Sequence, residues 1–296
     1  MRKYLVSTGV LPKCVGKEFY EYTGIAEAYE RLDVDGVELV FLPEWDPRHP
    51  PLTSTSSDWS RTPKAEVSEI VDLCLRYRLP VPVIHINRDV GNMLCSEDKA
   101  TVLYGQRILD ENLVGASELG SEIAVLHLWD TFSKDLDLER TFDRAYKVSK
   151  HHQIRIAVEN IPISDKKLTQ ETAWGLLTQM MPPDYGFTVD LNWSSLYNNF
   201  PQLKRYRHRI LNVHVQGYIA AAGDNAYTLK PRSGGLDILG CLAELCREGY
   251  DGYITLEMNK PKGEEDFKRA LQLIKTVCRA NDYSSKIRNL CRKKEK

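Results

Sequence analysis

The sequence has no apolar run long enough to cross a membrane, since none of its stretches reaches about 18 uninterrupted apolar residues. Its seven cysteines form an odd set and include no pair spaced as CxxC. Most of them fall within expected helices or strands, where a free cysteine acts as a small apolar residue. The first residues also lack the apolar core and cleavage site of a signal peptide. We therefore expect reduced thiols, a cytoplasmic location and no membrane partner.

Strong charge of one sign is missing as well. The formal net charge is −1, which gives no overall attraction to nucleic acid. No GxGxxG or GxxxxGKS/T motif occurs, so the sequence offers no phosphate-binding loop of these kinds. Basic residues gather only in a C-terminal tail at residues 284–296. Residues 1–283 have no shift in composition that would mark a second domain, and we expect one domain there.

What the sequence does contain is a regular alternation of apolar runs and helix-like segments. The runs are apolar on both faces, as expected when helices cover a parallel sheet. Eight such units favour a closed barrel over an open sheet, and 296 residues slightly exceed the about 250 typical of that fold. The predicted fold class is therefore α/β, a single (β/α)₈ TIM barrel with its active site at the C-terminal mouth of the strands. The expected strands are residues 3–10, 35–42, 80–87, 121–129, 155–160, 186–191, 210–215 and 251–258, and the expected helices are 17–32, 65–77, 97–119, 138–151, 170–180, 200–206, 236–248 and 265–280.

Residues that commonly bind metals close six of the apolar runs. The C-terminal ends of the strands of such a barrel meet at one mouth. Side chains that are far apart in the sequence are therefore expected to converge there. These strand-end residues are His85, His127, Glu159, Asp190, His214 and Glu257.

The last four of them, Glu159, Asp190, His214 and Glu257, form a set of three carboxylates and one imidazole. Such a mostly oxygen site suits Mn²⁺, Mg²⁺ or Co²⁺ and also admits Zn²⁺. A single carboxylate before a loop is ordinarily a helix cap or a surface charge, and a single strand histidine ordinarily belongs to the core. Four such residues on four consecutive strands favour a shared cation, because burying several carboxylates together costs free energy unless a cation or protons neutralise them.

Several short strings around these residues resemble one known family, the xylose isomerase-like TIM barrel superfamily. That superfamily includes sugar phosphate isomerases and epimerases, inosose dehydratases and endonuclease IV. The resemblance covers nearly the whole chain, but it does not select one member. The strings are VEN at 158–160, VDLNW at 189–193, NVHVQGY at 212–218, KPRSGGLDI at 230–238 and TLEM at 255–258.

The resemblance implies that Glu159, Asp190, His214 and Glu257 bind one divalent metal, with Mn²⁺ favoured. It also implies that Glu159 and Glu257 handle protons. A cation bound to the carbonyl and hydroxyl of a hydroxyketone acidifies the C–H between them and stabilises an enediolate. Two carboxylates could then remove a proton and return one. The leading hypothesis is a metal-dependent sugar or polyol isomerase or epimerase.

The sequence departs from the family where substrate contacts are expected. Many members have a histidine three positions after the sixth-strand aspartate, where this chain has Trp193. Ketose epimerases often have an arginine about six positions after the seventh-strand histidine, where this chain has Ala220. Lys230 and Arg232 could replace these contacts or face solvent. A barrel that binds a sugar without catalysis is therefore a further hypothesis.

His85 and His127 support another alternative. By strand, they match the two histidines that hold an additional metal in the endonuclease IV branch, where Glu159 would bridge the two ions. Trp193 removes a ligand of that branch's third metal, and no Asp-x-His follows His214. A dinuclear phosphoesterase is thus conceivable, although the near-neutral charge disfavours DNA as its substrate. Otherwise the two histidines line the sugar pocket as neutral hydrogen-bonding groups.

Two further features have open roles. Glu38 stands near the end of the second expected strand, where it either points into the mouth or pairs with a neighbouring base. Residues 43–63 form a long proline-rich loop that could be a lid or a substrate wall. The expected partner is a small sugar or polyol, nucleic acid is disfavoured, and self-association into a homo-oligomer is left open.

Overall fold

The computed structural model describes residues 2–18, 21–41, 66–223 and 226–294, with side chains described as far as residue 281. The loop at residues 43–63, suggested above as a lid or substrate wall, lies outside the described residues. In the described part of the chain, no helix combines the length and the apolar character that a membrane span requires.

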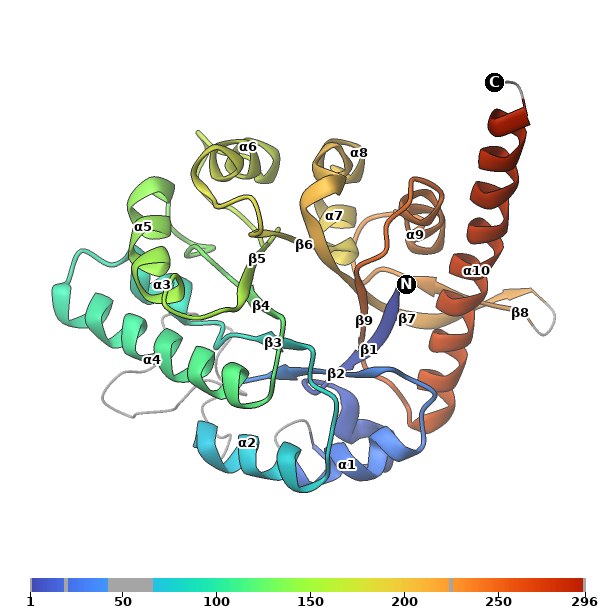
Figure 1. The fold of residues 1–296 in the computed structure, drawn as a ribbon, viewed down its shortest axis with the longest axis horizontal. Coiled ribbons are helices and arrows are strands. Elements are labelled where there is room, and N and C mark those ends of the chain that lie inside the picture. The colour runs from blue at the N-terminus through green and yellow to red at the C-terminus, as the bar shows by residue number, and fades with distance from the viewer. Residues whose placement is uncertain (1, 19–20, 42–65, 224–225, 295–296) are drawn as a thin grey trace.

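Eight parallel strands close into a barrel, which confirms the predicted fold (Figure 1). Neighbouring strands pair in parallel around the ring. The ring closes where the last strand pairs with both the first and the seventh. The barrel strands are β1 (Lys3–Ser7), β2 (Gly36–Val40), β3 (Val83–His85), β4 (Ile123–Leu126), β5 (Arg155–Glu159), β6 (Gly186–Asp190), β7 (Ile210–Gly223) and β9 (Tyr253–Met258).

Helices surround the barrel (Figure 1). The larger ones are α1 (Thr23–Glu30), α2 (Val67–Arg76), α4 (Lys99–Glu118), α5 (Leu138–Ser149), α6 (Gln170–Met180), α9 (Ile238–Arg247) and α10 (Glu264–Lys294). They pack on the strands through one large apolar cluster. Within it, the rings of Trp174 on α6 and Phe187 on β6 stack with centroids 4.2 Å apart. Packing of this kind fixes the strand ends relative to one another.

Some elements differ from the prediction. Residues 200–206, expected as one helix, divide between the short α8 (Phe200–Leu203) and a 3₁₀ helix at Lys204–Arg209. Two short helices, α3 (Val90–Cys95) and α7 (Leu191–Tyr197), were not predicted. They lie between a strand and the main helix that follows it, and their few residues show no clear apolar period. Helix α10 continues to Lys294 and so includes most of the basic tail; the domain boundary at residue 283 stays a prediction.

The interior of the barrel changes from apolar to polar along its length. Successive residues of a strand point alternately inward and outward. Leu5, Val83 and Val125 belong to a separate apolar cluster inside the barrel. Two residues further on, His85 ends β3 and His127 directly follows β4, and these two positions point inward. The apolar cluster therefore forms a floor, and the polar strand ends lie above it.

Strand β7 is longer than the expected residues 210–215. Beyond the barrel it continues and pairs with β8 (Ala226–Lys230) in an antiparallel hairpin, in which Tyr218 pairs with Lys230. Ala220 lies in this hairpin, opposite Thr228. The position at which ketose epimerases often have an arginine is thus on an extension of the barrel.

Candidate active site

Glu159, at the end of β5, lies at the centre of the predicted strand-end residues. Its Oε2 atom is 2.9 Å from Nε2 of His127 and 3.3 Å from Nε2 of His85. Its Oε1 atom is 3.6 Å from Nδ1 of His214. That same Nδ1 atom is 3.7 Å from Oε2 of Glu257 on β9. The two oxygens of Glu159 therefore face two different groups of potential metal ligands.

Asp190 completes the arrangement from the end of β6. One of its carboxylate oxygens lies within 4.8 Å of ligand atoms on Glu159 and His214. Its Oδ1 accepts a hydrogen bond from the backbone N–H of Trp193 at 2.7 Å and so caps α7. Asn160, next to Glu159, accepts from the Asp190 N–H at 2.6 Å and donates to the Asp190 carbonyl at 3.2 Å. Backbone and side chain of Asp190 are thus held in place.

Burial and mutual charge determine the ionisation of these groups. Burial raises the pKa of Asp190 well above its usual range, and the charge of Glu159 raises it further. Burial also raises the pKa of Glu257, although His214 opposes this. Burial acts in the same direction on Glu159, but the neighbouring histidines hold its pKa well below the usual value. For His214, burial acts to lower the pKa, and the surrounding carboxylates raise it well above the usual value.

A divalent cation fits this set of residues. Nδ1 of His214 and Oδ2 of Asp190 are buried, and neither has a hydrogen-bond partner among the described residues. Buried polar atoms are rarely left unsatisfied in this way. Three carboxylates and one imidazole are a donor set that accommodates Mn²⁺, Mg²⁺, Co²⁺ or Zn²⁺. A cation among them would satisfy both atoms and neutralise the clustered carboxylates.

The group formed by His85, His127 and Glu159 is a second candidate ligand set, with ligand atoms within 4.8 Å of one another. Nδ1 of His85 lies 2.9 Å from the carbonyl oxygen of Ile86, which can only accept, so Nδ1 carries the proton. In the neutral ring Nε2 is then an acceptor, yet it faces the Glu159 carboxylate. A proton or a cation must therefore lie between these two acceptor atoms.

A cavity of about 480 Å³ opens at the mouth of the barrel, which is in the range of small-molecule sites, about 300–1,000 Å³. Four of the predicted strand-end residues, His85, His127, Glu159 and Glu257, line it, and so does Trp193. Asp190 and His214 are fully buried beneath it. The lining also includes Gln216 and Asn259 as polar groups and Phe41, Phe132, Ile161 and Met258 as apolar ones.

Lys230 and Arg232 are exposed and do not belong to the lining of this cavity. The backbone N–H of Arg232 donates to Oδ1 of Asn192 at 2.7 Å, which ties its loop to α7. Substrate contact by the two basic side chains stays a prediction. Within the described part of the chain, the cavity itself offers Arg88 as a basic side chain.

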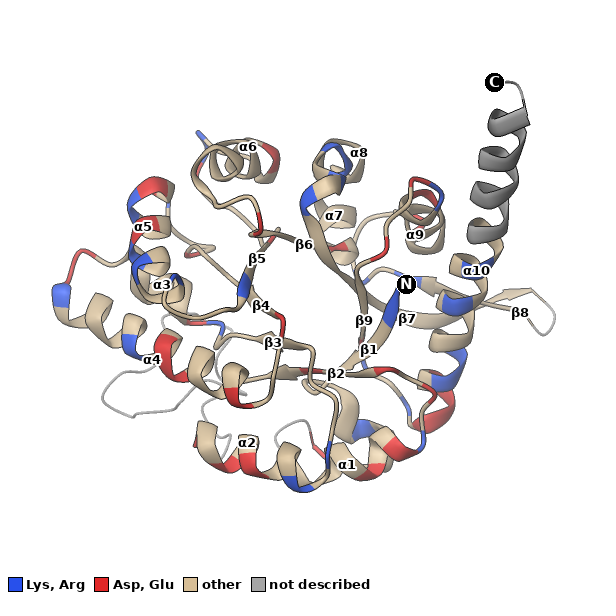
Figure 2. Cartoon of the chain, viewed as in Figure 1, with Lys and Arg blue, Asp and Glu red and all other residues tan. Residues whose placement is uncertain are grey.

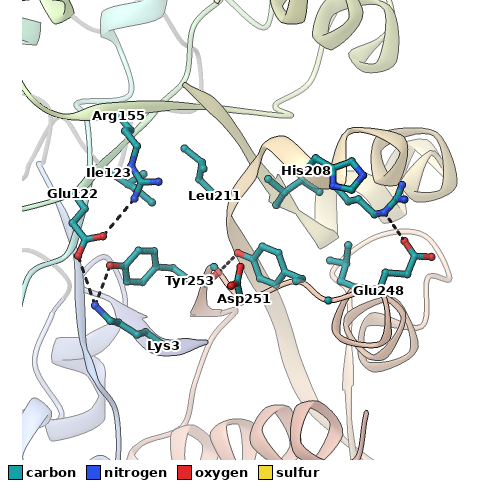
Figure 3. A pocket seen from close by; sticks show the side chains of 15 residues that line it. Lys3, Glu122, Ile123, Arg155, His208, Leu211, Glu248, Asp251 and Tyr253 are labelled. Carbon is teal, nitrogen blue, oxygen red and sulfur yellow. Dashed lines mark hydrogen bonds and ion pairs between the residues drawn. The ribbon is translucent and has the colours of Figure 1, made fainter. Parts of the chain in front are cut away.

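A second cavity, of about 470 Å³, lies at the opposite, N-terminal end of the barrel (Figure 3). Nζ of Lys3 is 3.7 Å from a carboxylate oxygen of Glu122 and 3.3 Å from the hydroxyl of Tyr253. The guanidinium of Arg155 is 3.4 Å from Glu122. These charged side chains pair with one another, and this face of a TIM barrel ordinarily serves stability. The C-terminal mouth is therefore the candidate active site.

Comparison with known proteins agrees with this fold. Residues 26–277 match the family model described as xylose isomerase-like TIM barrel. The chain belongs to this family. Membership of the xylose isomerase-like barrels confirms the resemblance that was drawn from the five short strings. No curated protein is significantly similar to the chain in sequence.

Solved structures with a similar fold include several sugar epimerases. A D-allulose 3-epimerase from Methylomonas sp., in complex with D-allulose, is 17% identical, with a TM-score of 0.66 over 93% of this chain and 96% of that one. An L-ribulose 3-epimerase is 14% identical, with a TM-score of 0.65 over 97% and 98%. A 3-keto-D-glucoside 4-epimerase from E. coli is 13% identical, with a TM-score of 0.61 over 93% and 100%. Likeness at these identities establishes the shared fold.

Two buried residues next to the site were not assigned to it from the sequence. Asn160 was part of the VEN string, but its role as a clamp on Asp190 was not predicted. Glu38 was left open, and it hydrogen-bonds to Nε2 of His214 inside the barrel. The sequence contained a signal for each of them. Asn160 is a polar residue directly after a strand-end carboxylate, and Glu38 is a carboxylate within an apolar strand.

Proposed function

We propose that this chain is a divalent-metal-dependent sugar or polyol isomerase or epimerase. One observation carries the proposal: Glu159 and Glu257, from β5 and β9, both line the mouth cavity and both face Nδ1 of His214, at 3.6 and 3.7 Å. Two carboxylates are thus placed around one candidate cation site and in contact with the space for a substrate. Glu159, Asp190, His214 and Glu257 would hold the cation, with Mn²⁺ favoured by the mostly oxygen donors.

When bound, the cation supplies the Lewis acidity that lowers the pKa of a C–H beside a substrate carbonyl. Glu159 and Glu257 approach the cavity from different strands, so a substrate held between them meets a carboxylate on each side. One carboxylate can remove the proton and the other can return one, and the reaction then proceeds through an enediolate. Trp193 and Phe132 add apolar surface to the lining of this cavity.

The structural neighbours support the substrate class. The named relatives are epimerases of sugars, and one of them was crystallised with the ketose D-allulose. The cavity volume and its mixed lining of Gln216, Asn259 and aromatic side chains suit a molecule of this kind. Trp193 and Ala220 differ from the residues expected for ketose epimerases, so we propose the class of substrate and no single sugar.

Solvent deuterium exchange tests the proposed function. The protein is purified, reconstituted with Mn²⁺ and incubated in D₂O with a panel of ketoses and polyols. We expect deuterium at a carbon next to the carbonyl of at least one substrate, together with its isomer. Metal-loaded protein that binds a sugar tightly without exchange would instead favour the non-catalytic sugar-binding hypothesis. If the metal-loaded protein shows no exchange and binds no sugar of the panel, the proposal is overturned.

A dinuclear phosphoesterase is the second candidate, and one observation favours it. Nε2 of His85 faces the Glu159 carboxylate at 3.3 Å, and a second cation beside His127 could take the place of the proton that this contact otherwise requires. Duplex DNA is disfavoured as the substrate, because its binding relies on the neutralisation of several phosphates. The net charge is −1, and helices α2, α4 and α5 each carry both signs (Figure 2). Hydrolysis of phosphate diesters by protein loaded with two cations is the test.

A cytoplasmic location is part of the proposal. The described cysteines are free and mostly buried, as expected for thiols of a reducing compartment. Fractionation of cells that express the full chain is the measurement.

A further inference from the structure

Glu38, in the middle of β2, is a fully buried carboxylate inside the barrel. Its neighbours in register are Ser7 on β1 and Val83 on β3. Inward positions of such barrels are mostly filled by branched apolar residues, and an unpaired buried charge is costly. A carboxylate at this position therefore needs hydrogen-bond partners, and its presence in place of an apolar residue calls for a role.

The partners of Glu38 come from two other strands. Its Oε1 accepts a hydrogen bond from Nε2 of His214 at 2.9 Å. Its Oε2 accepts from Oγ1 of Thr255 at 2.7 Å and from Nδ2 of Asn212 at 2.9 Å. Asn212 and Thr255 each precede a strand-end ligand candidate, His214 or Glu257, by two residues. Glu38 thus belongs to a buried polar layer directly beneath the candidate cation site.

This layer occupies both oxygens of Glu38 with donors from the protein. Glu38 also lies within 4.8 Å of ligand atoms of His214 and Glu257, which could suggest that it binds a cation itself. Three donors at 2.7–2.9 Å leave its carboxylate poorly available for that. Its contact with the site runs instead through the His214 ring.

The contact with Glu38 determines which nitrogen of the neutral His214 ring keeps a lone pair for a cation. An ionised carboxylate can only accept a hydrogen bond, so Nε2 of His214 carries a proton and donates it in a hydrogen bond to Glu38. In the neutral ring Nδ1 then keeps its lone pair, and Nδ1 is the atom that faces Glu159 and Glu257 without a hydrogen-bond partner. The ring is also packed against His85, with centroids 5.9 Å apart. Tautomer and orientation are therefore both fixed from beneath.

We propose that Glu38 is a positioning residue that holds His214 with Nδ1 toward the cation and thereby sets the cation affinity of the site. This role rests on the cation site of the proposed function. Carboxylate partners of metal-binding histidines orient the ring and increase its basicity. The alternative is that Glu38 only completes a hydrogen-bond network of the barrel core.

Two substitutions and one control separate these roles. Glu38→Gln keeps an acceptor for Nε2 but removes the charge, and Glu38→Leu removes the acceptor at similar volume. Thr255→Val is the matched control, because it deletes another donor of the same layer and leaves the Glu38–His214 contact in place. Thermal unfolding of each metal-free protein shows that the variants fold.

Mn²⁺ binding to each protein is measured by titration with EPR detection of free Mn²⁺. We expect Glu38→Gln to lower the affinity by about 10–100-fold, the usual effect of losing such a partner, with the number of bound ions unchanged. Glu38→Leu should lower it further, and Thr255→Val should change it by less than about threefold. In Zn²⁺-loaded, ¹⁵N-histidine-labelled protein, a slowly exchanging Nε2–H signal of His214 should be present in the wild type and lost in Glu38→Leu.

Four results would overturn the role. Equal Mn²⁺ affinity in wild type and folded Glu38 variants would leave only a structural network. An equally large loss in Thr255→Val would have the same meaning. Loss of a whole bound ion in Glu38→Gln would make Glu38 a ligand. A wild type that binds no divalent cation would overturn the proposed function together with this role, whereas the first three results would leave the cation site standing.

Discussion

The backbone N–H of Trp193 donates a hydrogen bond to Oδ1 of Asp190 at 2.7 Å. This bond caps α7, while Oδ2 of the same carboxylate is buried without a partner among the described residues. Asp190 therefore anchors a helix with one oxygen and can offer the other to a cation. Asparagine could keep the first role, since its amide oxygen also accepts a capping hydrogen bond. It would lose the second, because the amide carries no charge.

Asp190→Asn should abolish most cation binding without loss of stability in the metal-free protein. At a cation concentration about 100 times its dissociation constant, wild type should gain about 2.7 kcal/mol of stability. The variant should gain little. Thermal unfolding with and without Mn²⁺, together with elemental analysis, is the measurement. Equal metal content in the two proteins would remove Asp190 from the site.

The sign of the stability change follows from the pKa of Asp190, which burial and the charge of Glu159 raise well above its usual range in the folded protein. The unfolded chain ionises this group at its ordinary pKa. The carboxylate therefore destabilises the metal-free fold as the pH rises above that ordinary value. Asparagine removes this effect, so the metal-free variant should unfold at the same or a higher temperature at pH 7. A lower temperature would contradict the expectation.

Cation affinity should fall as the pH is lowered. Asp190 and Glu257 have raised pKa values, chiefly because they are buried, and the surrounding carboxylates raise the pKa of His214. Protons on these groups must leave before a cation binds. The affinity should therefore decrease by up to about tenfold per pH unit for each proton displaced. Mn²⁺ titrations between pH 5 and 8 would test this, and a flat profile would contradict it.

Glu159→Gln and Glu257→Gln should each reduce turnover by at least about a hundredfold, the lower scale of general acid–base catalysis. The shape of the side chain is kept and the basic carboxylate is lost. Turnover is compared with the metal content of each variant set to that of the wild type, so that lost metal is not mistaken for lost proton transfer. Glu122→Gln, at the opposite end of the barrel, is the matched control and should turn over normally. Unchanged turnover in either active-site variant would remove that glutamate from the mechanism.

The side chain and the backbone of Trp193 have different roles. The side chain lines the mouth cavity, and the backbone N–H donates a hydrogen bond to Asp190, the cap of α7, which any residue except proline could do. Trp193→Ala should therefore raise KM by about tenfold, equal to about 1.4 kcal/mol of lost substrate binding, with nearly unchanged Mn²⁺ affinity. Trp193→Phe should retain most of the binding. A large loss of Mn²⁺ affinity in Trp193→Ala would show that the side chain supports the metal site instead.

The strand-end residues of the site could be predicted because the topology determines where they meet. Apolar on both faces, the strands indicated a parallel barrel, and a parallel barrel brings its C-terminal strand ends together. His85, Glu159 and Glu257 followed from that alone. None of these three positions depends on loop structure, which sequence patterns specify poorly.

Other parts of the site depend on contacts that a pattern does not contain. Glu38 could have pointed into the barrel or paired elsewhere, and only its hydrogen bond to His214 decides between these. The clamp of Asn160 on Asp190 joins residues 30 positions apart, and the β7–β8 hairpin depends on antiparallel pairing outside the barrel. For Arg232 the sequence left substrate contact and solvent exposure both open; its side chain is exposed and its loop is held by a backbone hydrogen bond, so substrate contact stays a prediction.

His85→Ala distinguishes the two candidate functions. In an isomerase with one cation, His85 lines the cavity and lies 3.3 Å from Glu159, so its loss should raise KM while about one bound cation remains. In a dinuclear phosphoesterase, His85 and His127 are ligands, and either alanine variant should remove one of two bound cations. Elemental analysis of wild type, His85→Ala and His127→Ala after Mn²⁺ or Zn²⁺ loading measures this. His152, which is partly buried and paired with Asp110, is the control and should leave metal content unchanged on replacement by alanine. One cation in all proteins supports the isomerase, and a drop from two to one in both variants would make the phosphoesterase the leading function.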